Sequence, residues 1–211
     1  KVFHKFYKDL YSKFSGNTSI QSRILDSLNE EHVLAPHASD DSNLKLFDKE
    51  LMQSCLGNMA NNKTPGPDGL TAEFYKTFFD ILSDILLELY EEVSEGIIPR
   101  SMTEAVTVLI PKEGDVHSPS NYRPITLLNV DYKLMTKTIN KSFFTKFLND
   151  NLSNEQLCAV PGRDIRNGTI LIRDIISYCK SKGISASIVS LDQKKAFDMV
   201  DRCFLYKILK A

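Results

Sequence analysis

The chain has 211 residues, of which 42% are hydrophobic and 25% are charged, and this is enough apolar material for one sizeable core. No apolar run approaches the roughly 18 residues that cross a bilayer, and lysines interrupt the N-terminal segment, so we expect no membrane span, no signal peptide and no membrane partner. The four cysteines form no C-x-x-C pair and no metal-ligand pattern with the four histidines, which favours free, buried thiols in a reducing compartment.

The net charge of −1 is unevenly distributed along the chain. Residues 1–99 carry 9 Lys+Arg against 16 Asp+Glu, a net charge of −7, whereas residues 100–211 carry 17 against 11, a net charge of +6. A basic C-terminal half could follow a phosphate backbone, but solvated charged faces are common. Charge alone therefore leaves both interpretations open.

Apolar residues at helical spacing predict two N-terminal helices, over residues 3–14 and 20–28. The polar stretch 29–43 contains a proline and is expected to be a loop. A third helix is predicted over residues 44–59. Its apolar stripe consists of Phe47, Leu51, Cys55, Leu56 and Met59.

A tight irregular loop follows, because residues 65–69 contain two prolines and two glycines. Residues 71–96 then predict one long amphipathic helix that ends at Gly96. Its expected buried face consists of Phe74, Phe78, Ile81, Leu82, Ile85, Leu89 and Val93.

The pattern changes after Pro99, where the β-branched segment 104–112 predicts a strand. The segment PITLL predicts a second strand that pairs with the first as a hairpin, with the polar loop at its tip. Helices are expected from Asp131, over residues 165–180 and from about Asp201, with a strand over 186–192. Helices followed by strands interleaved with helices indicate an α+β fold with a helical lead-in.

The stretch SIVSLDQKKAFDMVD carries the most chemical information. A strand ending in Asp192 places a carboxylate at a sheet edge, where Mg²⁺ finds oxygen ligands, although a solvated strand-end residue is the simpler interpretation of this pattern alone. Phe197 could form the floor of a sugar pocket and exclude a 2′-hydroxyl, or it could pack in a core. Asp198 and Asp201 are interpreted as local structure, with Asp201 as a helix N-cap.

Five segments in order, TPGPDGLTAEFY, VLIPKEGD, NYRPITLLN, AVPGRDIRNG and SLDQKKAFDMVD, resemble the motif set of LINE-type (non-LTR retrotransposon) reverse transcriptases. The resemblance covers roughly the whole chain. It implies a right-hand polymerase fold, of which this chain holds the fingers and a partial palm. Residues 1–60 would be a helical N-terminal extension, and residues 61–211 the reverse transcriptase domain, truncated before the second catalytic motif.

The resemblance assigns catalytic roles to the last of these segments. By it, Asp192 is the first catalytic carboxylate and binds both Mg²⁺ ions. The carbonyl of Gln193 helps to hold the metal that carries the incoming triphosphate. Phe197 matches the aromatic side chain that discriminates against ribonucleotides.

The basic residues Lys112 and Arg123 match the two fingers residues that neutralise the triphosphate in this family. Their place on a paired-strand unit suits the role, because lysine acts as a point charge and arginine as a bidentate clamp. Without the resemblance, each is one exposed basic residue.

Three further residues are assigned to the template or primer by resemblance. The loop from Lys63 to Gly69, with Asp68, resembles an early fingers loop that touches the nucleic-acid backbone, although a purely structural turn fits it nearly as well. Arg163 resembles a residue near the template, and either contacts phosphate or pairs with an acidic neighbour. Cys158-Ala159 stands where many relatives carry Gly-Phe, so packing under the template could differ.

The implied reaction is RNA-directed DNA synthesis by phosphoryl transfer, with an RNA template, a DNA primer, a dNTP and two Mg²⁺ ions. An endonuclease domain is expected upstream in a longer protein, which would be intracellular, in the nucleus and the cytoplasm as a ribonucleoprotein. The 211 residues contain no Tyr/Phe-x-Asp-Asp motif. We therefore expect the isolated chain to be inactive and marginally stable.

Two other functions are compatible with parts of the sequence. A non-catalytic nucleic-acid-binding remnant of such a polymerase would bind RNA in a salt-sensitive way that does not depend on Asp192. An unrelated Mg²⁺-dependent phosphotransferase would need a second carboxylate close to Asp192, and LDQKK offers none.

Overall fold

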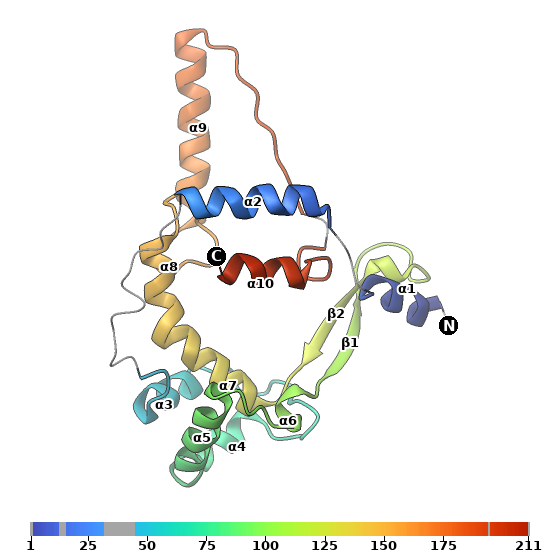
Figure 1. Cartoon of the computed structure of the whole chain (residues 1–211), viewed down its shortest axis with the longest axis vertical. Coiled ribbons are helices and arrows are strands. Elements are labelled where there is room, and N and C mark those ends of the chain that lie inside the picture. Colours follow the sequence, from blue (N-terminus) through green and yellow to red (C-terminus); the bar gives the residue numbers. More distant parts are fainter. Residues whose placement is uncertain (1, 13–15, 32–44, 194, 211) are drawn as a thin grey trace. The chain divides into compact units, whose positions relative to one another are not determined.

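The computed structural model of the chain describes residues 2–12, 16–31, 45–193 and 195–210 (Figure 1). It divides into two compact units, one formed by residues 1–36 with 164–211 and the other by residues 37–163. Residues 32–43 of the predicted N-terminal loop lie outside the described residues. None of the described helices is long and apolar enough to cross a membrane.

The central unit contains eight helical segments or turns and one hairpin in its described part. They are α3 Lys49–Gly57, α4 Ala72–Thr77, α5 Phe79–Ser94, α6 Arg100–Thr103, β1 Val106–Pro111, the 3₁₀ turn η2 Pro119–Asn121, β2 Tyr122–Leu127, α7 Val130–Ile139, the π-helical turn η3 Asn140–Phe144 and α8 Thr145–Asn151. The predicted α+β class is confirmed at this level. The predicted helix from Asp131 is present as α7, η3 and α8, which follow one another without a gap.

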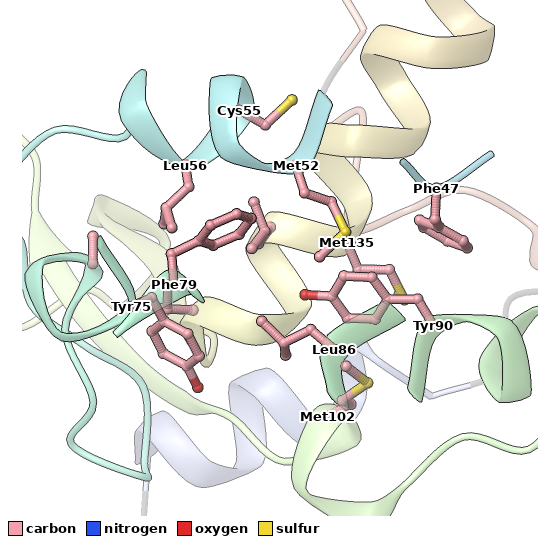
Figure 2. Packing of buried hydrophobic residues seen from close by; sticks show 13 residues of the cluster. Phe47, Met52, Cys55, Leu56, Tyr75, Phe79, Leu86, Tyr90, Met102 and Met135 are labelled. Carbon is pink, nitrogen blue, oxygen red and sulfur yellow. The ribbon is translucent and has the colours of Figure 1, made fainter. Parts of the chain in front are cut away.

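The core of the central unit lies where α3, α5 and α7 meet (Figure 2). Met52, Tyr90 and Leu134 are completely buried there. The Tyr90 hydroxyl donates a hydrogen bond of 2.8 Å to the carbonyl oxygen of Asp131, so this buried polar group is satisfied. The bond joins α5 to the first turn of α7.

The predicted third helix begins later than its apolar pattern suggested. Asp48 is the N-cap of α3 and accepts a hydrogen bond of 3.1 Å from the Leu51 amide, so the helix begins at Lys49. Phe47 lies before the helix but is still buried.

The predicted long helix over 71–96 is wrong in two respects. It is broken at Phe78 into α4 and α5, and the buried positions of α5 are Phe79, Ser83, Leu86 and Tyr90. Ile81 and Ile85, which were expected to be buried, are 72% and 61% exposed. This segment is apolar on several faces, so its periodicity does not select one, and packing against α3 and α7 does.

The end of this helix is as predicted. Gly96 has a φ of +96°, its amide donates to Val93, and the Ile97 amide donates to the carbonyl of Glu92. These bonds form a Schellman motif, for which glycine is the favoured residue.

The predicted hairpin is confirmed. Strands β1 and β2 are antiparallel, with Val106 opposite Leu127 and Ile110 opposite Arg123. The loop at the tip is closed by side chains, since the Tyr122 hydroxyl donates to the Val116 carbonyl at 3.0 Å and the Asn121 amide to the Asp115 carbonyl at 2.9 Å.

The Pro-Gly loop packs against the end of β2. A Cβ atom at Gly66 would come within 2.6 Å of the Leu128 carbonyl carbon and would overlap Asn129. The buried Asn129 side chain accepts a hydrogen bond from the Asp68 amide at 3.3 Å and donates one of 3.0 Å to the Ser101 carbonyl. The glycine is thus required by a close backbone approach.

The other unit contains α1 Val2–Leu10, α2 Thr18–Glu31, α9 Ile165–Lys182 and α10 Arg202–Lys210, all of which correspond to predicted helices. Asp201 is the N-cap of α10, as expected, and its Oδ1 accepts from the Phe204 amide at 3.1 Å. Its Oδ2 accepts from Gln21 Nε2 at 3.0 Å and from the Gly16 amide at 3.4 Å, so the same carboxylate joins α10 to the start of α2.

The predicted strand over 186–192 is absent. These residues form no regular structure and pair with no strand among the described residues, and Leu191 is 92% exposed. A β-branched segment becomes a strand only when a second strand satisfies its backbone groups.

The cysteines are free, as predicted, but only Cys55 is buried. Cys158 and Cys203 are exposed, because they lie on a turn and on the first turn of α10, outside the core.

Replacing Gly66 by alanine is expected to destabilise the chain by about 2–3 kcal/mol, because the new methyl group overlaps Asn129. The matched control is Gly57→Ala at the end of α3, where a Cβ meets nothing within 4 Å and a small gain in stability is expected. Urea unfolding followed by circular dichroism measures both. Equal stability of Gly66→Ala and the wild type would contradict the close approach.

Asp201→Ala is expected to lower the melting temperature at neutral pH, because it removes the N-cap of α10 and the link to α2. The hydrogen bond from Phe204 and then that from Gln21 lower the pKa of Asp201 below 3.8. The contribution of the carboxylate is therefore complete above pH 3.8 and is lost as the pH falls through the lower, folded-state pKa. Melting curves of both proteins should converge in acid, whereas Asp174→Ala, at an exposed position, should match the wild type throughout.

Candidate functional site

The predicted site residues are divided between the two compact units. Asp192, Gln193 and Phe197 lie in the unit formed by both ends of the chain. Lys63, Asp68, Lys112, Arg123 and Arg163 lie in the central unit.

Asp192 and Gln193 are exposed at the end of the unpaired segment, and a turn follows them. The turn is closed by the Asp198 amide, which donates to the Lys195 carbonyl at 3.0 Å, and Lys195 has a φ of +51°. Phe197 sits in this turn with its ring 99% exposed. An aromatic ring without core contacts is available to a ligand, so the core-packing alternative for Phe197 is excluded in this structure.

Three contacts from the N-terminal helices hold the turn that carries Phe197. The Tyr11 hydroxyl donates to Asp198 Oδ1 at 3.3 Å, and the Lys195 ammonium lies 4.3 Å from the centre of the Phe6 ring. Partial burial, and then the Asp198 charge, raise the pKa of Tyr11, so its hydroxyl remains a donor at neutral pH. A third contact follows this turn, where the Asp201 carboxylate accepts from Gln21 Nε2 and the Gly16 amide.

Nothing in the local sequence patterns assigns Phe6, Tyr11 or Gln21 to the site. The signal in the sequence is the four-residue spacing of Tyr7, in α1, and Tyr11, directly after it, and their rings stack with centroids 6.0 Å apart. Tyr11 contacts a residue 187 positions later and Gln21 one 180 positions later, and helical spacing carries no information about such distant partners.

Asp192 fits one position of a magnesium site. Its carboxylate makes no hydrogen bond or ion pair within the described part of the chain, and Mg²⁺ prefers such oxygen ligands. Asp198 and Asp201 are engaged with Tyr11 and with the α10 N-terminus. No group of three or more His, Cys, Asp or Glu among the described residues could hold a metal ion. Asp192 would therefore need further metal ligands that these described side chains do not supply.

Lys112 and Arg123 lie on the same face of the hairpin. Arg123 is directly opposite Ile110, and Lys112 is two residues beyond Ile110, so the side chains of all three point to one side. The Lys112 amide donates to the Asn121 carbonyl at 2.6 Å, which continues the ladder beyond β1. Both side chains are exposed, and neither has a carboxylate partner among the described residues.

The Pro-Gly loop presents Lys63 to solvent and uses Asp68 for its own structure. Asp68 Oδ1 accepts from the Leu70 amide at 3.0 Å, a local bond that closes the turn. The Lys63 side chain is exposed and lines a surface depression together with residues of α7.

The guanidinium of Arg163 is bound to main-chain carbonyls. It donates to Leu152 at 2.9 Å, to Gln156 at 2.8 Å and to Ser153. These bonds fasten the turn after α8, so in this structure Arg163 has a structural role. A phosphate would have to displace them or share the guanidinium.

Comparison with known proteins gives the family. Residues 110–211 match the family described as reverse transcriptase (RNA-dependent DNA polymerase). This segment begins in β1 and includes Lys112, Arg123 and the whole stretch around Asp192.

Several transposon proteins are similar over longer segments. The transposon TX1 uncharacterized 149 kDa protein of Xenopus laevis is 36% identical over 207 residues, which are 98% of this chain. Pol polyproteins of R2 elements from Popillia japonica and Drosophila melanogaster are 30% and 26% identical over 69% and 71% of it. The chain spans only 14–20% of the length of these three relatives.

The order of the motifs, the paired strands that carry two of them and these similarities agree with one another. The chain belongs to the reverse transcriptases of LINE-type, or non-LTR, retrotransposons.

Proposed function

We propose that the chain supplies the fingers and the first part of the palm of an RNA-directed DNA polymerase that acts in target-primed reverse transcription. The observation that carries the proposal is the hairpin, which presents Lys112 and Arg123 on one face with no carboxylate among the described residues to neutralise them. The family match across residues 110–211 supports it. In this proposal residues 1–60 are an N-terminal extension, and residues 61–211 belong to the polymerase domain.

Each basic residue has a separate task in nucleotide binding. Lys112 and Arg123 would neutralise the triphosphate of an incoming dNTP, with lysine as a compact charge and arginine as a two-pronged donor. Because both are on one two-stranded unit, a movement of the hairpin would bring them to the nucleotide together. Phe197, held by its turn, would exclude a 2′-hydroxyl.

Asp192, with the carbonyl of Gln193, would provide oxygen ligands for Mg²⁺. When bound, two magnesium ions supply the positive charge that stabilises the entering and leaving oxygens in phosphoryl transfer. The other ligands would come from a part of the longer protein that carries further carboxylates. The chain by itself is therefore proposed to be inactive.

The remaining partners follow from the same assignment. An RNA template and a DNA primer would pass near Lys63, Asp68 and Arg163, and an endonuclease domain would precede the polymerase in the longer protein. That protein would work in the nucleus and the cytoplasm as a ribonucleoprotein. A non-catalytic RNA-binding remnant remains the second candidate, favoured by the basic second half of the chain.

Asp192→Ala in a polymerase containing this chain is expected to reduce primer extension on an RNA template by about 10³-fold or more, because a metal ligand is lost. Asp174→Ala, on an exposed face of α9, is the control and should extend primers normally. Normal extension by the Asp192 variant would overturn the assignment. RNA binding without any extension by the wild type would favour the remnant.

Phe197→Ala is expected to increase ribonucleotide incorporation relative to deoxynucleotide incorporation, because the exposed ring no longer excludes a 2′-hydroxyl. Single-nucleotide extension with matched dNTP and rNTP measures the ratio. Phe144→Ala, another exposed aromatic side chain, is the control and should keep the wild-type ratio. An unchanged ratio in the Phe197 variant would remove Phe197 from the sugar site.

A further inference from the structure

Two neighbouring surface depressions follow the junction of α3 and α7 in the central unit. One has a volume of about 540 Å³ and the other of about 300 Å³, and both are open to solvent. They share Asn58 and Lys137 in their linings, so they lie side by side. Volumes of this size are typical of sites that hold a ligand of nucleotide dimensions.

Among the residues that the structure describes, four lysines and no acidic residue line the two depressions. Lys133, Lys137 and Lys141 are spaced four residues apart along α7 and η3, about 6 Å per step, and Lys63 reaches the smaller depression from the Pro-Gly loop. None of the four has an ion-pair partner within the described ranges. The surface therefore carries an uncompensated positive charge along a line.

Part of this arrangement has a structural purpose. Lys137 Nζ donates to the Asn58 carbonyl at 3.2 Å and Lys141 Nζ to Ser54 Oγ at 2.8 Å, so both stabilise the C-terminal end of α3. Each ammonium has three donors, and these bonds use one of them. Lys133 and Lys63 make no side-chain hydrogen bond to a described residue, so capping of α3 does not account for them.

The neutral groups of the lining also suit a nucleic acid. Thr136 and Thr145 donate to carbonyls of the preceding turn, and Asn58 Nδ2 donates to the Ser54 carbonyl. Their oxygens remain acceptors between the lysines, and such neutral polar groups accompany lysine at sugar–phosphate contacts. Asn140 and Lys141 belong to the π-helical turn η3, and such turns are frequent at functional sites. A positively charged groove that follows the backbone is a common feature of single-strand binding.

We propose that Lys63, Lys133, Lys137 and Lys141 form a track for the phosphodiester backbone of single-stranded RNA, separate from the nucleotide-binding residues on the hairpin. The inference rests on the proposed function, which supplies RNA as the partner. The depressions between the lysines receive nucleosides, and this requires unpaired bases. The 2′-hydroxyl, as donor and acceptor, bonds to the neighbouring asparagines and threonines.

The test is binding of the 211-residue chain to a fluorescent 12-nucleotide RNA, by anisotropy over a range of salt concentrations. The principal variant is Lys63→Gln with Lys133→Gln, because neither side chain supports the fold. Loss of two phosphate contacts should reduce the slope of log K against log salt by about 1.4 and weaken binding more than tenfold at low salt. The matched control is Lys180→Gln with Lys182→Gln on α9, which has the same change of charge and should retain the wild-type slope.

A second pair of variants separates charge from fold. Lys137→Gln with Lys141→Gln should lose both RNA binding and thermal stability, while Lys137→Arg with Lys141→Arg should recover binding. DNA of the same sequence should bind more weakly than RNA. An unchanged slope in the Lys63/Lys133 variant, an equal loss in the α9 control, or equal binding of DNA would overturn the proposal.

The Asp192→Ala variant distinguishes this site from the polymerase assignment. It should bind RNA like the wild type if the track is correct, whatever its effect on primer extension. If the Asp192→Ala variant loses primer extension but still binds RNA, both the catalytic role of Asp192 and the RNA track are supported. If that variant extends primers normally and only the lysine variants lose RNA binding, the catalytic role of Asp192 is overturned and the RNA track is supported.

Discussion

The buried amide of Asn129 is the junction on which the central unit depends. It is 3% exposed, and its side chain bonds at once to the Asp68 amide and to the Ser101 carbonyl. Its own carbonyl accepts from the Lys133 amide in the first turn of α7. Four segments therefore meet at this one residue: the Pro-Gly loop, the segment before β1, the end of β2 and the start of α7. A buried amide that lost these partners would be costly, so the four segments are fixed together.

This junction explains why motifs far apart in the sequence occur together. The loop needs Gly66 because its backbone lies against residues 128 and 129, and those residues directly follow the strand that carries Arg123. The position of Lys63 beside α7 follows from the same packing. A residue such as Gly66 thus serves the site indirectly, by permitting a close approach of two backbones, and no chemistry of its own is needed.

The other unit shows a different way of positioning a functional side chain. Phe197 is fully exposed, yet its turn is held by Tyr11, Phe6 and the Asp201 cap. The segment before it, with Leu191 92% exposed, has apolar side chains but no strand partner among the described residues. Asp192 therefore stands at the end of a chain segment whose backbone groups are not yet organised by a sheet. The carboxylate is exposed, and no strand among the described residues pairs with this segment to fix its orientation.

The sequence by itself determined the helix ends that carry capping residues, such as the end of α5 at Gly96 and the start of α10 after Asp201. It also determined the β1–β2 hairpin, because helix caps and strand patterns act locally. It also indicated the family through ordered motifs. Only the tertiary structure decided which face of α5 is buried, that residues 186–192 pair with no described strand, and that Arg163 binds carbonyls. It also decided that four lysines line two adjoining depressions. Each of these depends on contacts between residues distant in sequence, and neither helical spacing nor strand propensity contains that information.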